Sequence, residues 1–358
     1  MENSGRRSEV IDGFRAISIF SVLLFHYLVR WSPPLNSDDF YGYHYRYSEF
    51  FRIGQFGVHI FFVISGLVIA MTIVKSQSVV DFAVRRFARL YPAYFVAATL
   101  LAVIISISGG VLHVSLRDYL ATLTMAAPQL GAHYVDGAYW SLFVEVKFYI
   151  LVAALFVVLK NNFWVGLIAV SLIGAVIRPY YPHMAELLLM VHFLPLFLIG
   201  ISGWYYIYNS QIGVAAALLA TGLLCYALNA ASLVQEMRAP SLDFVAHTMI
   251  LGGAAVMMFM LRFRSYTRFG PLAYIGRASY SWYLIHQSLG VIVISFLCGR
   301  LGFPDFVGFG TALVLSLAVA CAMFEWVELP AQRMILRSWH HGRAHLLGRV
   351  GKQDSQRG

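Results

Sequence analysis

The chain has 358 residues, of which 59% are hydrophobic and only 12% are charged, and its formal net charge is +9. Soluble domains carry roughly 25% charged residues, so this composition excludes an ordinary soluble protein. Long apolar runs indicate a polytopic helical membrane protein, and short alternating segments typical of a transmembrane β-barrel do not occur. We attribute the positive charge to cytoplasmic loops and predict no nucleic-acid partner.

The apolar runs predict an all-α transmembrane bundle of about ten spans, each about 20 residues long. These spans cover residues 11–30, 54–74, 91–111, 138–159, 163–178, 186–208, 212–230, 243–261, 279–299 and 305–326. If the N-terminus is inside, 17 Lys and Arg residues fall in inner segments and 7 in outer segments. This bias predicts that both termini are cytoplasmic.

The chain is predicted to contain one membrane domain, residues 1–330, followed by a basic cytoplasmic tail, residues 331–358. A basic segment next to the membrane is attracted to anionic lipids, so we expect the tail to lie along the inner leaflet. Arg6 and Arg7 before the first apolar run resemble the start of a signal peptide. Asp12 and Arg15 interrupt that run, however, and no small-residue cleavage site follows, so we expect a retained first span.

The first span carries two ionisable residues, Arg15 and His26. At about 100° and 1.5 Å per residue, they lie on nearly the same helix face, about 16 Å apart along the axis. Ionisable groups within a membrane usually face a bundle interior or a wet cavity, so the pair indicates a polar path. The alternative is an arginine that reaches the lipid headgroups and a histidine at the opposite interface.

Three arginines, Arg85, Arg86 and Arg89, cluster on one predicted helix in the inner loop that ends at Pro92. Cytoplasmic charge bias alone would place cations in this loop. A tight arginine cluster is nevertheless a better phosphate site than scattered lysines, because a guanidinium binds phosphate in a bidentate way. A nucleotide-bearing donor such as coenzyme A fits such a cluster.

The fourth span places Ser141, Glu145 and Tyr149 on one face, because they are four residues apart. A carboxylate within the membrane needs a partner, for which Arg15 and His26 are the candidates. Lys147 lies about 200° away from Glu145 around the helix and points elsewhere.

The ninth span repeats this pattern with Ser279, Tyr283 and His286. Three spans thus each carry a polar stripe. This pattern favours a functional cavity inside the bundle over the alternative in which the polar side chains only extend to the membrane–water interfaces. In the second span, Gly57 and Gly66 would let other helices approach closely, while His59 is expected near the outer interface.

Six motifs together resemble the integral-membrane acyltransferase-3 family. They are Arg15-x10-His26, G-V-H-I-F-F-V-I-S-G, R-R-F-A-R-L-Y-P, W-S-L-F-V-E-V-K-F-Y, S-Y-S-W-Y-L-I-H and E-W-V-E-L-P, which extend in order from Ile11 to about Pro330. The resemblance implies a bacterial O-acyltransferase that acts on lipopolysaccharide O-antigen, exopolysaccharide, lipochito-oligosaccharide or related sugars. It also implies functional roles for Arg15 and His26 and a role in acyl-CoA use for Arg86 and Arg89. His59 departs from the family, which more often has a carboxylate at that position.

We therefore expect a multi-pass inner-membrane O-acetyltransferase that uses acetyl-CoA as co-substrate, with no tightly bound cofactor and no metal site. Its partners would be the acyl-CoA donor, a glycan or lipid-linked glycan acceptor, and membrane lipids. His26 would be the general base, Glu145 would orient it, and Arg15 would stabilise the oxyanion. An acetyl-histidine intermediate, a succinyl donor and a proton-coupled transporter of a sugar or lipid remain as alternatives.

Overall fold

The computed structural model describes residues 9–29, 39–40, 43–44, 49–108, 112–236, 243–263 and 269–354. These residues are almost entirely helical, apart from two short antiparallel strands, β1 (Asp39–Phe40) and β2 (Tyr43–His44). The predicted all-α polytopic bundle is confirmed.

Ten apolar helices correspond to the ten predicted spans. They are α1 (Glu9–Leu28), α2 (Gly57–Lys75), α3 (Val79–Ser108), α5 (Trp140–Leu159), α6 (Phe163–Ile177), α8 (Leu194–Ile207), α9 (Ile212–Glu236), α10 (Asp243–Arg262), α11 (Pro271–Ile294) and α12 (Asp305–Met323). Within the described residues, nine stretches are long and apolar enough to cross a membrane, and one of them, Gly137–Ile177, contains both α5 and α6. The predicted first and third spans end at residues 30 and 111, which lie outside the described part of the chain.

The remaining elements connect or extend these helices. They are α4 (Leu116–Thr122), α7 (Pro182–Leu189), α13 (Leu329–Asp354), the 3-10 turns η1 (Glu49–Phe56), η2 (Ala127–Leu130), η3 (Gly137–Tyr139) and η4 (Lys160–Asn162), and the π-helical turns η7 (Ser295–Arg300) and η8 (Phe324–Glu328).

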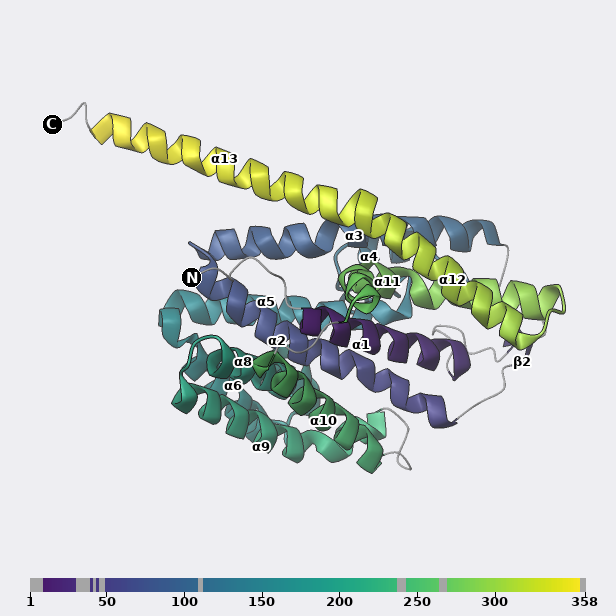
Figure 1. The fold of residues 1–358 in the computed structure, drawn as a ribbon, viewed down its shortest axis with the longest axis horizontal. Helices are drawn as coiled ribbons and strands as arrows, with labels where there is room; N and C mark the ends of the chain where they lie inside the picture. Colours follow the sequence, from purple (N-terminus) through teal and green to yellow (C-terminus); the bar gives the residue numbers. More distant parts are fainter. Residues whose placement is uncertain are drawn as a thin grey trace.

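The helices form a continuous bundle (Figure 1). In this view α6, α8, α9 and α10 lie together below, α3 and α13 lie above, and α1, α2 and α5 lie between them. Helix α1 packs against α2 and α11, α2 against α8, and α3 against α11 and α13. The polar stripes of α1, α2, α3, α5 and α11 consequently meet inside the bundle.

Two glycines bring neighbouring helices into close contact, as the sequence predicted. A Cβ atom at Gly57 would collide with the Ser18 carbonyl of α1, and one at Gly66 would collide with the Phe197 carbonyl of α8. Small residues of this kind let membrane helices approach backbone to backbone.

Helix α3 begins earlier than the predicted third span. It runs without interruption from Val79 through Pro92, so the arginine cluster and the membrane span belong to a single helix. The helix that carries the span therefore starts well before residue 91, where the span was predicted to begin. A proline inside a helix removes one backbone hydrogen bond, but packing within a membrane bundle offsets this loss.

The C-terminal segment also differs from a detached tail. Helix α12 passes through η8 directly into α13, which crosses α3 in Figure 1. The helix therefore continues across residue 330, where the sequence analysis placed a domain boundary.

Candidate active site

A partly open cavity of about 880 Å³ lies between α1, α2, α3, α5, α8, α11 and α13. Nine of the eleven predicted site residues line it: Arg15, Arg85, Arg86, Arg89, Ser141, Glu145, Tyr149, Ser279 and Tyr283. His26 and His286 are not among the lining residues. The cavity thus brings together the arginine cluster and the polar stripes of three spans.

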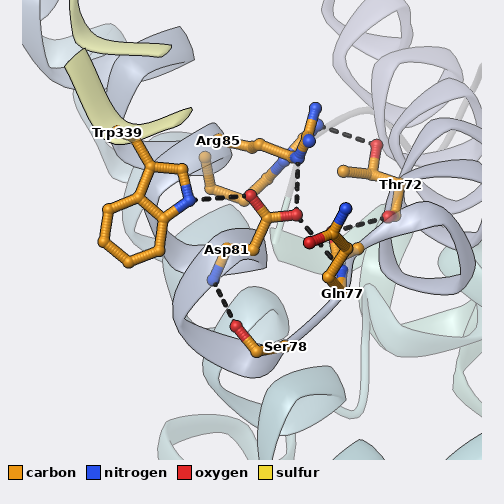
Figure 2. Close-up of polar contacts among 8 residues, drawn as sticks. Thr72, Gln77, Ser78, Asp81, Arg85 and Trp339 are labelled. Atoms are coloured by element: carbon orange, nitrogen blue, oxygen red, sulfur yellow. Dashed lines mark hydrogen bonds and ion pairs between the residues drawn. The ribbon is translucent and has the colours of Figure 1, made fainter. Parts of the chain in front are cut away.

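The arginine cluster and Lys75 give the cavity a cationic wall near the connection between α2 and α3. Arg85 is held by Asp81, whose Oδ2 atom lies 3.0 Å from its Nε atom (Figure 2). Arg86 donates from Nη2 to the Thr72 hydroxyl at 2.8 Å. Its guanidinium also lies 5.6 Å from the centre of the Tyr149 ring.

Arg89 forms an ion pair with Glu328, a carboxylate that is only 1% exposed. The other carboxylate oxygen of Glu328 accepts from the Ser281 hydroxyl at 2.7 Å, and Arg89 lies over the Tyr280 ring at 5.2 Å. The π-helical turn η8 contains Glu328, in agreement with the frequent occurrence of such turns at functional sites. The predicted phosphate-binding arginines therefore already have partners within the protein.

Glu145 is hydrogen-bonded differently from the prediction. Its Oε1 atom accepts from the Ser65 hydroxyl at 2.7 Å and from the Tyr149 hydroxyl. Among the described contacts Glu145 does not pair with Arg15 or His26 as expected, and its hydrogen bonds come instead from hydroxyl groups on α2 and α5. Arg15 instead lies 3.6 Å from the buried Asp12, one helical turn earlier.

His26 and His286 lie against each other, with ring centroids 5.1 Å apart. The His286 ring lies 5.4 Å from the Tyr283 ring, and the Tyr283 hydroxyl lies 2.8 Å from the Ser141 hydroxyl. Because Tyr283 and Ser141 line the cavity, a series of side-chain contacts joins the cavity to His26.

Polar side chains from two other segments, α1 and the turn η3 with its N-cap residue Asp136, contact the backbone of α11 around His286. The Tyr27 hydroxyl donates to the His286 carbonyl, and the Tyr139 hydroxyl donates to the Leu284 carbonyl, both at 2.9 Å. The Ser288 amide donates to Asp136 at 2.9 Å. Asp136 precedes the apolar stretch that begins at Gly137, and burial raises the pKa of its carboxyl to about 6, opposed by N–H donors from Ala138 and Ser288.

Two residues outside the cavity clarify the remaining predictions. Lys147 donates to the carbonyls of Glu186 and Leu187 in the last turn of α7, so it points away from Glu145, as predicted. His59 lies in the first turn of α2 and is completely buried between aromatic rings, including Phe56 and Phe193, so its side chain faces the protein interior.

Sequence reasoning missed several residues that hold the site together. Glu328 belongs to the E-W-V-E-L-P motif, but that motif carried no predicted role. Ser65 and Thr72 are seven residues apart and therefore share a face of α2. This spacing is a sequence signal for a further polar stripe, which the prediction did not include. Asp81 is four residues before Arg85, a spacing typical of a helical ion pair, but no role was predicted for it. It is completely buried at the start of α3.

The fold and the cavity define a multi-pass helical membrane protein with a polar, cationic internal site. The chain belongs to the acyltransferase-3 family, whose model, described as an acyltransferase domain, matches residues 9–325. The resemblance noted in the sequence is thus confirmed.

One relative is Nodulation protein 10 of Rhizobium leguminosarum bv. viciae, which is 29% identical over 113 residues. That match covers 26% of this chain and 31% of the relative, so the chain spans about a third of the relative's length in the comparison. No solved structure matches this chain.

Proposed function

We propose that this protein transfers an acetyl group from cytoplasmic acetyl-CoA to a hydroxyl group of a cell-surface or exported glycan, in the inner membrane of a bacterium. The main supporting observation is the cavity, which extends from the arginine cluster to the polar residues beside His26 and His286. Such a cavity offers separate places for an anionic donor and for the reacting groups.

The donor is held by Arg85, Arg86 and Arg89. Each guanidinium has five N–H donors, so an arginine that is held by partners within the protein can also donate to phosphate oxygens. Asp81, Thr72 and Glu328 then act as supports that hold the three side chains toward the cavity. The phosphates of coenzyme A bind here, and its pantetheine arm extends toward Arg15.

The transfer step uses His26 as general base. The acceptor oxygen attacks the thioester carbonyl, and His26 takes the hydroxyl proton as the new C–O bond forms. The C–S bond then breaks, and coenzyme A leaves as a thiolate that takes up a proton. Arg15 stabilises the negative charge on the carbonyl oxygen, a role typically worth a few kcal/mol.

Glu145 acts on the donor side of the cavity. By accepting from Tyr149, it fixes the aromatic ring over which the Arg86 guanidinium lies. This role replaces the predicted orientation of His26. The polar lining is completed by Ser141, Ser279 and Tyr283. His286 lies behind this lining, in contact with both Tyr283 and His26.

Inverted membrane vesicles test the proposal. Acetyl-CoA or succinyl-CoA is added outside, and a glycan fraction from the same bacterium is enclosed inside. We expect coenzyme A release outside together with acetylation of the enclosed glycan. Movement of a solute without coenzyme A release would contradict the proposal and support a transporter. Transfer from succinyl-CoA but not from acetyl-CoA would show that the transferred group is succinyl.

A further inference from the structure

The C-terminal helix α13 contributes directly to the cavity. Gln332 and Leu336 line it together with the arginines of α3. Gln332, Leu336 and Trp339 follow one another at intervals of four and three residues, so they share one helix face. Arg333 and Arg337 lie outside this face and are exposed. One side of α13 therefore belongs to the site.

Trp339 connects α13 to the arginine cluster through Asp81 (Figure 2). The indole Nε1 atom donates to Asp81 Oδ1 at 2.9 Å. Asp81 Oδ2 accepts from Arg85 Nε at 3.0 Å and from the backbone N–H of Gln77 at 3.2 Å. Asp81 is completely buried, so both of its oxygen atoms need donors. The position of Arg85 thus depends on a contact with α13.

We propose that α13 forms a wall of the donor-binding site and that Trp339, acting through Asp81, is a positioning residue for Arg85. The inference rests on the proposed function, because it assigns a further part of the same donor site. It gives residues 331–343 a role in binding the nucleotide part of an acyl-CoA.

The physical consequence of losing the indole N–H follows from Asp81. Without this donor, Oδ1 becomes a buried acceptor with no partner, and the carboxylate is free to rotate toward Arg85. Such a rotation draws the guanidinium away from the cavity. The affinity for the donor falls, whereas the groups around His26 keep their positions.

Binding of coenzyme A to the purified full-length protein in detergent, measured by calorimetry, tests the role of Trp339. We expect Trp339→Phe to raise Kd about threefold to tenfold, as for the loss of one hydrogen bond. The donor KM should rise in parallel, while kcat at saturating donor stays unchanged. Trp326→Phe is the matched control, because Trp326 is 79% exposed on the turn before α13, and it should bind like wild type.

A second pair of variants tests the wall without touching Asp81. Leu336→Trp adds bulk to the cavity lining and should weaken coenzyme A binding more than Trp339→Phe does. Ser338→Trp places the same bulk on the exposed face and should leave binding unchanged. Thermal unfolding of each variant identifies any that fail to fold.

Wild-type affinity in both Trp339→Phe and Leu336→Trp would overturn the assignment of α13 and leave the proposed function intact. Failure of the wild-type protein to bind coenzyme A would instead overturn the proposed donor itself. The two failures are therefore distinguishable in one set of titrations.

Discussion

Glu145 and Lys147 are two residues apart on α5, yet they contact different parts of the molecule. Glu145 faces the cavity and accepts from Ser65 and Tyr149, while Lys147 donates to the last carbonyls of α7. The last carbonyl groups of a helix have no N–H partner within that helix, and Lys147 supplies donors to those of α7. Glu145 therefore contributes to the cavity, whereas Lys147 stabilises the packing of α5 against α7.

This difference predicts separable effects of substitution. Glu145→Gln should lower kcat/KM about tenfold or more with little change in melting temperature, because an amide donor replaces one carboxylate oxygen beside Tyr149. Lys147→Met should lower stability by about 1–3 kcal/mol and leave the activity of the folded protein unchanged. Acyl transfer and thermal unfolding measured on both variants check this. Equal losses of activity would show that the face assignment for α5 is wrong.

The hydroxyl of Tyr27 should affect catalysis through the His286 backbone. Tyr27→Phe removes its bond to the His286 carbonyl and should lower kcat about tenfold while the donor KM stays constant. The matched control is Tyr94→Phe, which removes a buried hydroxyl that donates to the Thr122 carbonyl at 2.6 Å, away from the cavity lining. Both variants should lose about 1 kcal/mol of stability. The same kcat in both would reduce Tyr27 to a structural role.

Single residues show how far sequence reasoning reached. Arg15, Glu145 and the arginine cluster were predictable, because an ionisable residue in an apolar helix stands out. The partner of Arg89 was not predictable, since Glu328 is more than 200 residues away in the sequence and only the fold brings the two together. The contact between His26 and His286 was hidden for the same reason.

At the scale of helices, α2 and α8 pack most closely where each has a glycine. A Cβ atom at Gly200 would collide with the Val63 carbonyl, in the same region where Gly66 meets the Phe197 carbonyl. The number and type of helices followed from hydrophobic length. The extents of α3 and α13 could not be predicted in this way. Each helix contains a proline, which usually marks a helix boundary, and only the packing in the bundle shows that the helix continues there.

This contact predicts that Gly200→Ala destabilises the protein by about 1–3 kcal/mol, as expected for overpacking. Gly310→Ala is the control, because Gly310 lies within α12 and an added Cβ would meet nothing within 4 Å. It should be neutral or stabilising by up to about 1 kcal/mol, since alanine favours helix more than glycine does. Thermal unfolding in detergent compares the two. Equal stability of both variants would contradict this prediction, because it would show that α2 and α8 can move apart without a loss of free energy of unfolding.

For the whole molecule, the site depends on one long-range ion pair between α3 and η8. Arg89→Ala leaves Glu328 buried without its cation and should cost about 3 kcal/mol of stability. Adding Glu328→Gln should recover much of this stability, because the buried charge is then absent. The donor KM should nevertheless stay raised in the double variant, since the phosphate contact is still missing. A KM restored to the wild-type value would mean that Arg89 supports the fold but does not bind the donor.

The proposed function requires the bundle to assemble one acyl-transfer site around His26, reached from the arginine cluster. The most direct test is mass spectrometry of the surface glycans of a deletion strain that carries either wild-type protein or His26→Gln. Glutamine retains hydrogen bonding but cannot accept a proton at neutral pH. We predict that the wild-type protein restores one acetyl group on one sugar, whereas His26→Gln restores none although it accumulates in the membrane. Near-wild-type acetylation by His26→Gln would contradict the account.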